Sequence, residues 1–151
     1  MPFLIISIIA LAAGLYFLFF RVLFSVGDYG KDVVEINGEK INIEIVKSAL
    51  AQARGLSVKE SIAGDHGMLF VFSDSAVRNF WMKGMKFPID IVWISGRKII
   101  GFAENVPPQP GVKDSELKLY SSPGPADKVL EMKAGSVRRL GIVSGTEING
   151  L

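Results

Sequence analysis

The chain has 151 residues, 49% of them hydrophobic, a formal net charge of +2 at pH 7, one histidine and no cysteine. This length accommodates one domain and a short appendage. The small net charge, with no dense stripe of Lys and Arg, argues against nucleic-acid binding. Without cysteine the chain has no disulfide and lacks the thiolate ligands of most structural zinc sites.

Residues 2–20 form an uncharged, mainly apolar segment. About 20 apolar residues are enough for a helix to cross a bilayer, so residues 1–26 are expected to be a retained transmembrane anchor that contacts lipid through residues 2–24. The alternative is a secretory signal with a cleavage site at residues 25–27. The apolar run is longer than the about 7–15 residues usual in such signals and no Lys or Arg precedes it, which favours the anchor.

A polar tether is expected at residues 27–33, followed by a β-rich domain at residues 34–151. The dipeptide Asn37-Gly38 separates two β-prone runs and is a strong signal of a two-residue hairpin. A short helix is expected at residues 49–54, because Ser48 can cap its first turn and Gly55 can end it.

Six more short strands and a second short helix are expected farther along the chain. The strands are at residues 68–72, 78–83, 89–94, 98–103, 117–121 and 129–132, and the helix at 136–140 is closed by Gly141. Trp93 is expected in the core, within the hairpin that turns at residues 95–97. The expected fold class is therefore mainly β with two short helices, a small barrel-like or sandwich domain behind one N-terminal transmembrane helix.

His66 is the only histidine, so a zinc site or a Ser-His-Asp arrangement would have to recruit it. It lies in a glycine-flanked turn, and a surface turn residue is the favoured interpretation. The acidic residues do not follow the spacing of an EF-hand, and no Walker loop or dinucleotide fingerprint is present. We therefore expect no metal and no cofactor.

Asp90 stands in a run apolar enough to be buried on both faces. A buried carboxylate needs a partner, and Lys83, Lys86 or backbone N–H groups are candidates. In the structural interpretation, Asp90 ties the loop at residues 83–88 to the sheet. In the functional interpretation, it lies in a cleft and works with Glu104 as acid and base.

Three further residues are candidates for ligand binding. Glu104 and Asn105 lie at a strand end, where a carboxylate and an amide could bind a saccharide hydroxyl or a peptide amide, or could satisfy loop backbone groups. Trp81 and Lys83 could form a stacking platform, although a core position is favoured for the tryptophan. We expect one cleft formed by Trp81, Lys83, Asp90, Glu104 and Asn105, roofed by residues 106–111.

Several short motifs are characteristic of a known family. They are Gly67-Met68-Leu69-Phe70-Val71-Phe72, Phe80-Trp81-Met82-Lys83, Pro88-Ile89-Asp90, Glu104-Asn105-Val106-Pro107-Pro108, Val129-Leu130-Glu131-Met132, Ala134-Gly135 and Leu140-Gly141. With these motifs, residues 36–148 resemble domain of unknown function family 192. The resemblance implies a small β-rich domain and no settled biochemistry.

Two opposing indications bear on which side of the membrane the domain lies. Relatives in this family often carry secretory leaders, which implies an extracytoplasmic domain. Arg21 and Lys31 after the apolar segment would instead favour the cytoplasm. We expect the extracytoplasmic side.

These features predict a membrane-tethered, non-catalytic binding or accessory module at the cell envelope, with a saccharide or peptide ligand and a monomeric state. One alternative is a hydrolase or lyase that uses Asp90 and Glu104 on an envelope polymer. Another is a domain that docks a protein through the proline loop at residues 106–111.

Overall fold

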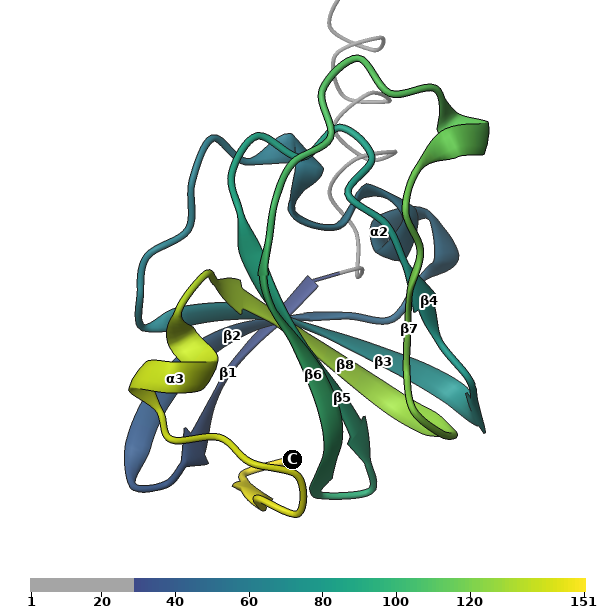
Figure 1. The fold of residues 1–151 in the computed structure, drawn as a ribbon. Helices are drawn as coiled ribbons and strands as arrows, with labels where there is room; N and C mark the ends of the chain where they lie inside the picture. Colours follow the sequence, from purple (N-terminus) through teal and green to yellow (C-terminus); the bar gives the residue numbers. More distant parts are fainter. Residues whose placement is uncertain (1–28) are drawn as a thin grey trace, which may run out of the picture.

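The computed structural model describes residues 29–151, so the expected anchor at residues 1–26 lies outside the described residues. Within residues 29–151, no helix has the length and apolar character needed to cross a membrane. The described chain forms a strongly twisted sheet that curls into a half-barrel, with short helices beside it (Figure 1). The predicted mainly β class with short helices is confirmed.

Seven strands make the main sheet, in the order β6-β5-β8-β3-β2-β1-β9. They are β1 (Tyr29–Ile36), β2 (Glu39–Val46), β3 (His66–Ala76), β5 (Ile89–Ser95), β6 (Lys98–Val106), β8 (Ala126–Lys133) and β9 (Ile148–Asn149). Neighbouring strands are antiparallel except for β2 and β3, which are parallel. A parallel pair needs a crossover connection, and here α2 (Ala49–Arg54) and the 3-10 turn η1 (Gly55–Val58) supply it.

Both hairpins predicted from local sequence are confirmed. Asn37 and Gly38 have φ values of 50° and 85°, the left-handed pair that a two-residue turn between β1 and β2 requires. The second hairpin joins β5 and β6 through Gly96 and Arg97.

The helices follow their local signals. The side-chain oxygen of Ser48 accepts a hydrogen bond from the Ala51 N–H and so caps α2. The second helix, α3 (Ser136–Arg139), is followed by Gly141 with φ 61°.

Two expected strands are much shorter than predicted. In place of residues 78–83 and 117–121, the structure has a two-residue pair, β4 (Asn79–Phe80) with β7 (Tyr120–Ser121). The first run leaves the ladder because the chain turns between Met82 and Met85, where the Met85 N–H donates to the Met82 carbonyl. In the second run, the Lys118 N–H donates to the Gln109 side chain instead of a strand.

The sheet separates two apolar cores, one on each face. The α3-side core contains Val92, Ile94, Leu130, Met132 and Val137 among others. The α2-side core contains Phe70, Ile91, Trp93, Val129 and Leu56 among others. Successive side chains of a strand point to opposite faces, so neighbouring residues of β5 and β8 enter different cores. Trp93 is 4% exposed, which confirms its predicted core position.

A late segment of the chain joins the two edges of the curled sheet. Strand β9 pairs with β1 at one edge. At the other edge, the Ile99 N–H donates to the Thr146 carbonyl at 2.9 Å and the Ile148 N–H donates to the Arg97 carbonyl at 2.9 Å. The sheet is therefore closed at this end.

Candidate functional site

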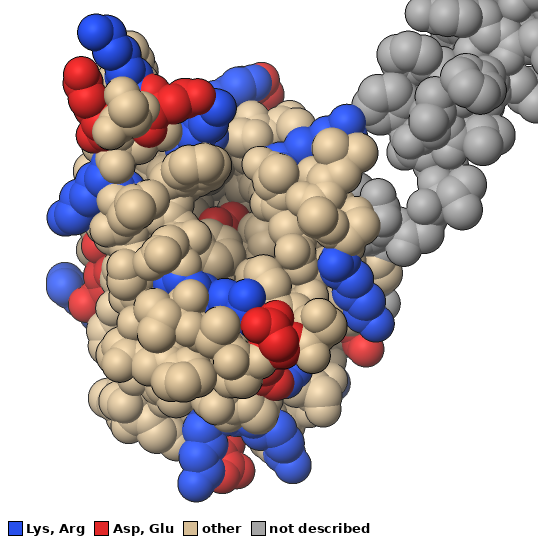
Figure 2. Space-filling model, turned by 90° about the vertical axis from the view of Figure 1, so that its right-hand side faces the viewer, with Lys and Arg blue, Asp and Glu red and all other residues tan. Residues whose placement is uncertain are grey.

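A cavity of about 340 Å³ opens on the α2 side of the sheet. Space-filling atoms show it as a hollow with acidic atoms at its floor and basic side chains at its edge (Figure 2). Its lining comes from α2, η1, β3, the segment around β4, and one residue of β8, Glu131.

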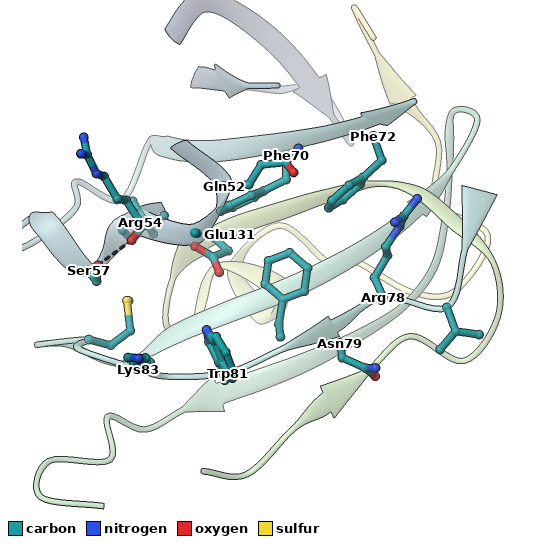
Figure 3. A pocket seen from close by; sticks show the side chains of 16 residues that line it. Gln52, Arg54, Ser57, Phe70, Phe72, Arg78, Asn79, Trp81, Lys83 and Glu131 are labelled. Atoms are coloured by element: carbon teal, nitrogen blue, oxygen red, sulfur yellow. Dashed lines mark hydrogen bonds between the residues drawn. The ribbon is translucent and has the colours of Figure 1, made fainter. Parts of the chain in front are cut away.

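Glu131 is one of the lining residues, and the other labelled side chains lie around it (Figure 3). Its neighbours in β8, Leu130 and Met132, point into the α3-side core, so alternation turns Glu131 to the α2 side. The residue is 5% exposed, and its Oε2 has no hydrogen-bond partner among residues 29–151. Burial raises the pKa of this carboxyl from 4.5 to about 8, because a charged carboxylate is disfavoured away from water.

The carboxyl is closely covered by the start of η1. Gly55 has φ 48°, and a side-chain carbon placed there would lie 3.3 Å from the Phe70 ring and 3.7 Å from Glu131 Oε2. Glycine therefore lets the backbone approach the acid and the ring that flanks it.

Aromatic side chains form the walls. Phe70 and Phe80 meet edge to face with their ring centroids 5.2 Å apart. Phe72 and Trp81 complete the set, and Trp81 is 48% exposed. Such a surface provides large apolar contact for a flat ligand.

Three cationic side chains, Arg54, Arg78 and Lys83, line the cavity mouth. Arg54 and Arg78 lie on opposite sides of Glu131, and Lys83 lies on a third side next to Trp81 (Figure 3). The Arg78 guanidinium lies 3.9 Å from the centroid of the Phe72 ring and pairs with Asp74 at 2.8 Å. Lys83 pairs with Asp114 in an exposed ion pair and has its ammonium 5.9 Å from the Trp81 ring centroid.

The structure divides the five predicted site residues into two groups. Trp81 and Lys83 line the cavity, whereas Asp90, Glu104 and Asn105 do not. Asp90 alternates with Val92 and Ile94 and therefore faces the α3 side of the sheet. Residues 106–111 likewise contribute nothing to the lining of this cavity.

Asp90 is fully buried and both of its oxygens accept hydrogen bonds from backbone N–H groups. Oδ1 accepts from Asn105 at 2.7 Å and Oδ2 accepts from Val137, in the first turn of α3, at 2.8 Å. Of the expected partners, backbone N–H groups are the observed ones, and neither lysine bonds to it. The carboxylate ties β6 and α3 to β5, and not the loop at residues 83–88 as the structural interpretation expected.

Glu104 and Asn105 lie opposite Asp90, where the register of the β5–β6 ladder shifts between Ile89 and Ile91. Asn105 has φ 49°, which directs its N–H toward Asp90. Glu104 lies 4.0 Å from the Arg138 side chain on α3. Because Asp90 is wholly enclosed, it has no route to a substrate, and the geometry gives no support to acid–base chemistry by this pair.

Glu131 was not among the residues singled out from the sequence, although a signal for it exists. It interrupts the apolar run Val129-Leu130-Glu131-Met132 in the same way that Asp90 interrupts residues 89–94. Among residues 29–151, no group of three or more His, Cys, Asp or Glu side chains is placed to hold a metal ion.

Comparison with known proteins identifies the family. Residues 32–150 match the family model of DUF192, described as an uncharacterized ACR. The chain belongs to the DUF192 family. None of the curated proteins matches this DUF192 chain significantly.

Two crystal structures share the fold of this DUF192 domain. One, from Sinorhizobium meliloti 1021, is described as a proposed transcription regulator; it is 28% identical, with a TM-score of 0.73, and the match covers 83% of this chain and 97% of that one. The other, a protein of unknown function from Novosphingobium aromaticivorans, is 25% identical, with a TM-score of 0.71, and the match covers 79% of this chain and 84% of that one.

Proposed function

We propose that this DUF192 domain is a non-catalytic module that binds a small ligand in the cavity on the α2 side of the sheet. The single observation that carries the proposal is the buried carboxyl of Glu131 at the floor of an aromatic-lined hollow, where its Oε2 has no hydrogen-bond partner among residues 29–151. A polar atom buried without a partner costs stability. A ligand that supplies the missing hydrogen bond recovers that cost on binding.

The lining supports binding over catalysis. Among the described residues that line the cavity, Glu131 is the one that carries a carboxyl group. Hydrolysis of a glycoside normally requires two carboxyl groups across the scissile bond, so the hydrolase or lyase alternative has no second acid here. The cavity also lies within the range of roughly 300–1,000 Å³ that is usual for small-molecule sites.

The proposal includes a membrane tether at residues 1–26 and an extracytoplasmic location for the domain. The length of the apolar segment at residues 2–24 supports the tether. Carbonate extraction of cell membranes should leave the full-length chain in the pellet and release a chain that starts at residue 29. Protease added to intact spheroplasts should then digest the domain; protection of the domain would place it in the cytoplasm instead.

The proposal does not extend to nucleic acid, although one structural neighbour is described as a proposed regulator. Several basic residues of the domain, including Lys59, Lys86 and Arg139, pair with carboxylates. Such pairing, with a net charge of +2, leaves little positive potential for a phosphate backbone.

A fragment screen tests the binding function. The full-length chain in lipid nanodiscs is mixed with small aromatic fragments of both charges, and binding is followed by ligand-observed NMR against empty nanodiscs. A blocking variant, Ala53→Trp, places a large side chain on an exposed helical position that lines the mouth. Its matched control is Leu50→Trp, on the same helix, 57% exposed and outside the cavity lining.

Fragments should bind the parent chain and the Leu50→Trp control equally, and should lose binding to Ala53→Trp. If no fragment distinguishes these variants, the cavity is not a ligand site and the proposed function is wrong.

A further inference from the structure

We propose that the cavity takes a small, flat organic anion with a hydrogen-bond acceptor at its inner end, and that Glu131 donates a hydrogen bond to that acceptor. The inference rests on the proposed binding function and adds the chemical class of the ligand. It follows from the size of the cavity, the charges at its mouth and the state of the acid at its floor.

The size fits one aromatic ring with a substituent at each end. The cavity measures about 340 Å³, and an apolar cavity of about 150 Å³ already holds benzene. The edge-to-face pair of Phe70 and Phe80 and the exposed ring of Trp81 offer contact to a flat body.

The mouth selects for negative charge. Arg54, Arg78 and Lys83 line it on three sides. The carboxylates that pair with Arg78 and Lys83, Asp74 and Asp114, are not among the lining residues, so the cations are nearer to the cavity, and their fields add in the partly enclosed space, where the effective dielectric is lower than in water. An anionic group at the outer end of the ligand is attracted by all three. A cationic group at the same place is repelled by all three.

Lys83 is the cation best placed to contact the ligand directly. Its ammonium pairs with Asp114, and the two side chains are 51% and 64% exposed. Exposed ion pairs of this kind contribute little, so Lys83 can turn to a ligand anion at small cost. Arg78 is held in place by Asp74 and by the Ala126 carbonyl, and acts through its charge.

The floor selects for an acceptor. Glu131 is flanked in the sheet by Met68 on β3 and Ile91 on β5, and Gly55 covers it from η1. None of the cations Arg54, Arg78 and Lys83 is among the causes of its shifted pKa, which is raised to about 8 by burial alone. Near pH 7 the carboxyl therefore carries its proton and is a donor.

The opposite ligand class is an organic ammonium ion, held by an ionised Glu131 and the aromatic faces. The structure disfavours it because Arg78 already lies over Phe72 and Lys83 lies near the face of Trp81. These resident cations would have to move away before a ligand cation could use the rings.

Three matched probes separate these possibilities: 4-acetylbenzoate, 4-ethylbenzoate and 4-acetylbenzylamine. The first has an anion, a flat ring and a carbonyl acceptor; the second lacks the acceptor; the third replaces the anion with a cation. With the full-length chain in nanodiscs, we expect 4-acetylbenzoate to bind with a Kd on the order of 1 mM, as for a good ligand of this size. Each of the other two should bind about tenfold more weakly.

Variants of Glu131 test the direction of the hydrogen bond. Glu131→Gln keeps a donor and should retain the preference for the acetyl over the ethyl probe. Glu131→Met keeps the size, removes the donor and should abolish that preference. Raising the pH through about 8 should abolish it in the parent chain, where the proton is lost, but not in Glu131→Gln. Glu116→Gln, an exposed acid in η2 (Asp114–Glu116), is the control.

A variant at the exposed mouth supplies a second test that does not depend on a buried substitution. Lys83→Met should weaken 4-acetylbenzoate severalfold and leave the neutral analogue 4-ethylacetophenone unchanged. Tighter binding of 4-acetylbenzylamine than of 4-acetylbenzoate would overturn the ligand class, while the binding function would stand. If none of the three probes binds, while other fragments bind the parent chain and not Ala53→Trp, the ligand class is likewise wrong and the binding function still stands.

Discussion

Two buried acids of this domain have the same sequence signal and opposite surroundings. Asp90 and Glu131 each interrupt an apolar strand, and each is almost fully buried. Asp90 accepts two backbone hydrogen bonds, whereas Glu131 Oε2 accepts none among the described residues. A satisfied buried acid holds elements together, and an unsatisfied one is available to a ligand.

Asp90→Ala should destabilise the domain strongly, because it leaves the N–H groups of Asn105 and Val137 without their partner. Each buried donor without a partner costs about 1–3 kcal/mol, so we expect a loss of about 2–6 kcal/mol in the free energy of unfolding. Urea denaturation followed by circular dichroism measures it. Asp90→Asn, which keeps one acceptor oxygen, should cost less, and Glu116→Ala should cost almost nothing. Equal stability of Asp90→Ala and the parent chain would disprove the structural tie.

Glu131 should make the domain less stable as the pH rises. Its pKa is raised to about 8 in the folded state against the ordinary 4.5, so between these values the folded state holds a proton that the unfolded state has lost. The free energy of unfolding should fall by about 1.4 kcal/mol per pH unit across this window from this group alone. Below the window both states are protonated, and above it both are ionised.

Glu131→Gln removes this titration. The other titratable groups contribute equally to the variant and to the parent chain, so the difference between their free energies of unfolding isolates the effect of Glu131. The stability advantage of the variant should therefore grow from about pH 5 to about pH 8 and then level off. Urea midpoints measured at several pH values provide the check. A constant difference across that range would mean that the carboxyl is not perturbed.

At the level of secondary-structure elements, the sequence correctly predicted the features that depend on interactions between residues close in the chain. The Asn37-Gly38 turn, the Ser48 cap and the β5–β6 hairpin each depend on residues close in sequence, and each is present. The lengths of β4 and β7 and the existence of β9 depend on partners that lie far away along the chain. No sequence window contains those partners, so these features could not be predicted locally.

Asn37 joins the first hairpin to the second helix. Its Nδ2 donates to the carbonyls of Leu140 at 2.9 Å and Gly141 at 3.2 Å, at the end of α3. Asn37→Gly preserves the left-handed turn and removes only these bonds, so we expect a loss of about 1–3 kcal/mol. Asn37→Ala should lose about 1 kcal/mol more, because alanine disfavours positive φ. Equal unfolding free energies for the two variants would contradict the strain at this turn.

For the whole molecule, the two faces of the sheet decide which residues can form a site. The expected cleft combined five residues that are close in sequence, but Trp81 and Lys83 lie at the α2-side cavity while Asp90 faces the α3 side. Alternation along β5 was predictable, but which face carries the open cavity was not. That depends on α2, η1 and β4, which frame the hollow on one face only.

Removal of residues 1–28 should leave a soluble, folded monomer. The main sheet and both cores lie within residues 29–151, and the family match begins at residue 32. Size-exclusion chromatography with light scattering gives the mass, and near-UV circular dichroism reports the environment of Trp93. An insoluble or molten product, with dye-accessible apolar surface and no near-UV signal, would mean that the first 28 residues belong to the core.

The closure of the sheet by residues 145–149 bears on how the protein is made. During synthesis, β1 to β8 leave the ribosome first, with β1 and β6 as unpaired edges that can join other strands. Translation proceeds at about 5–20 residues per second, so the nascent sheet keeps both edges open for on the order of a second before β9 emerges. A chaperone that covers strand edges would act in that interval, and a chain truncated between residues 133 and 145 would keep β1 and β6 as unpaired edges and would be prone to aggregate.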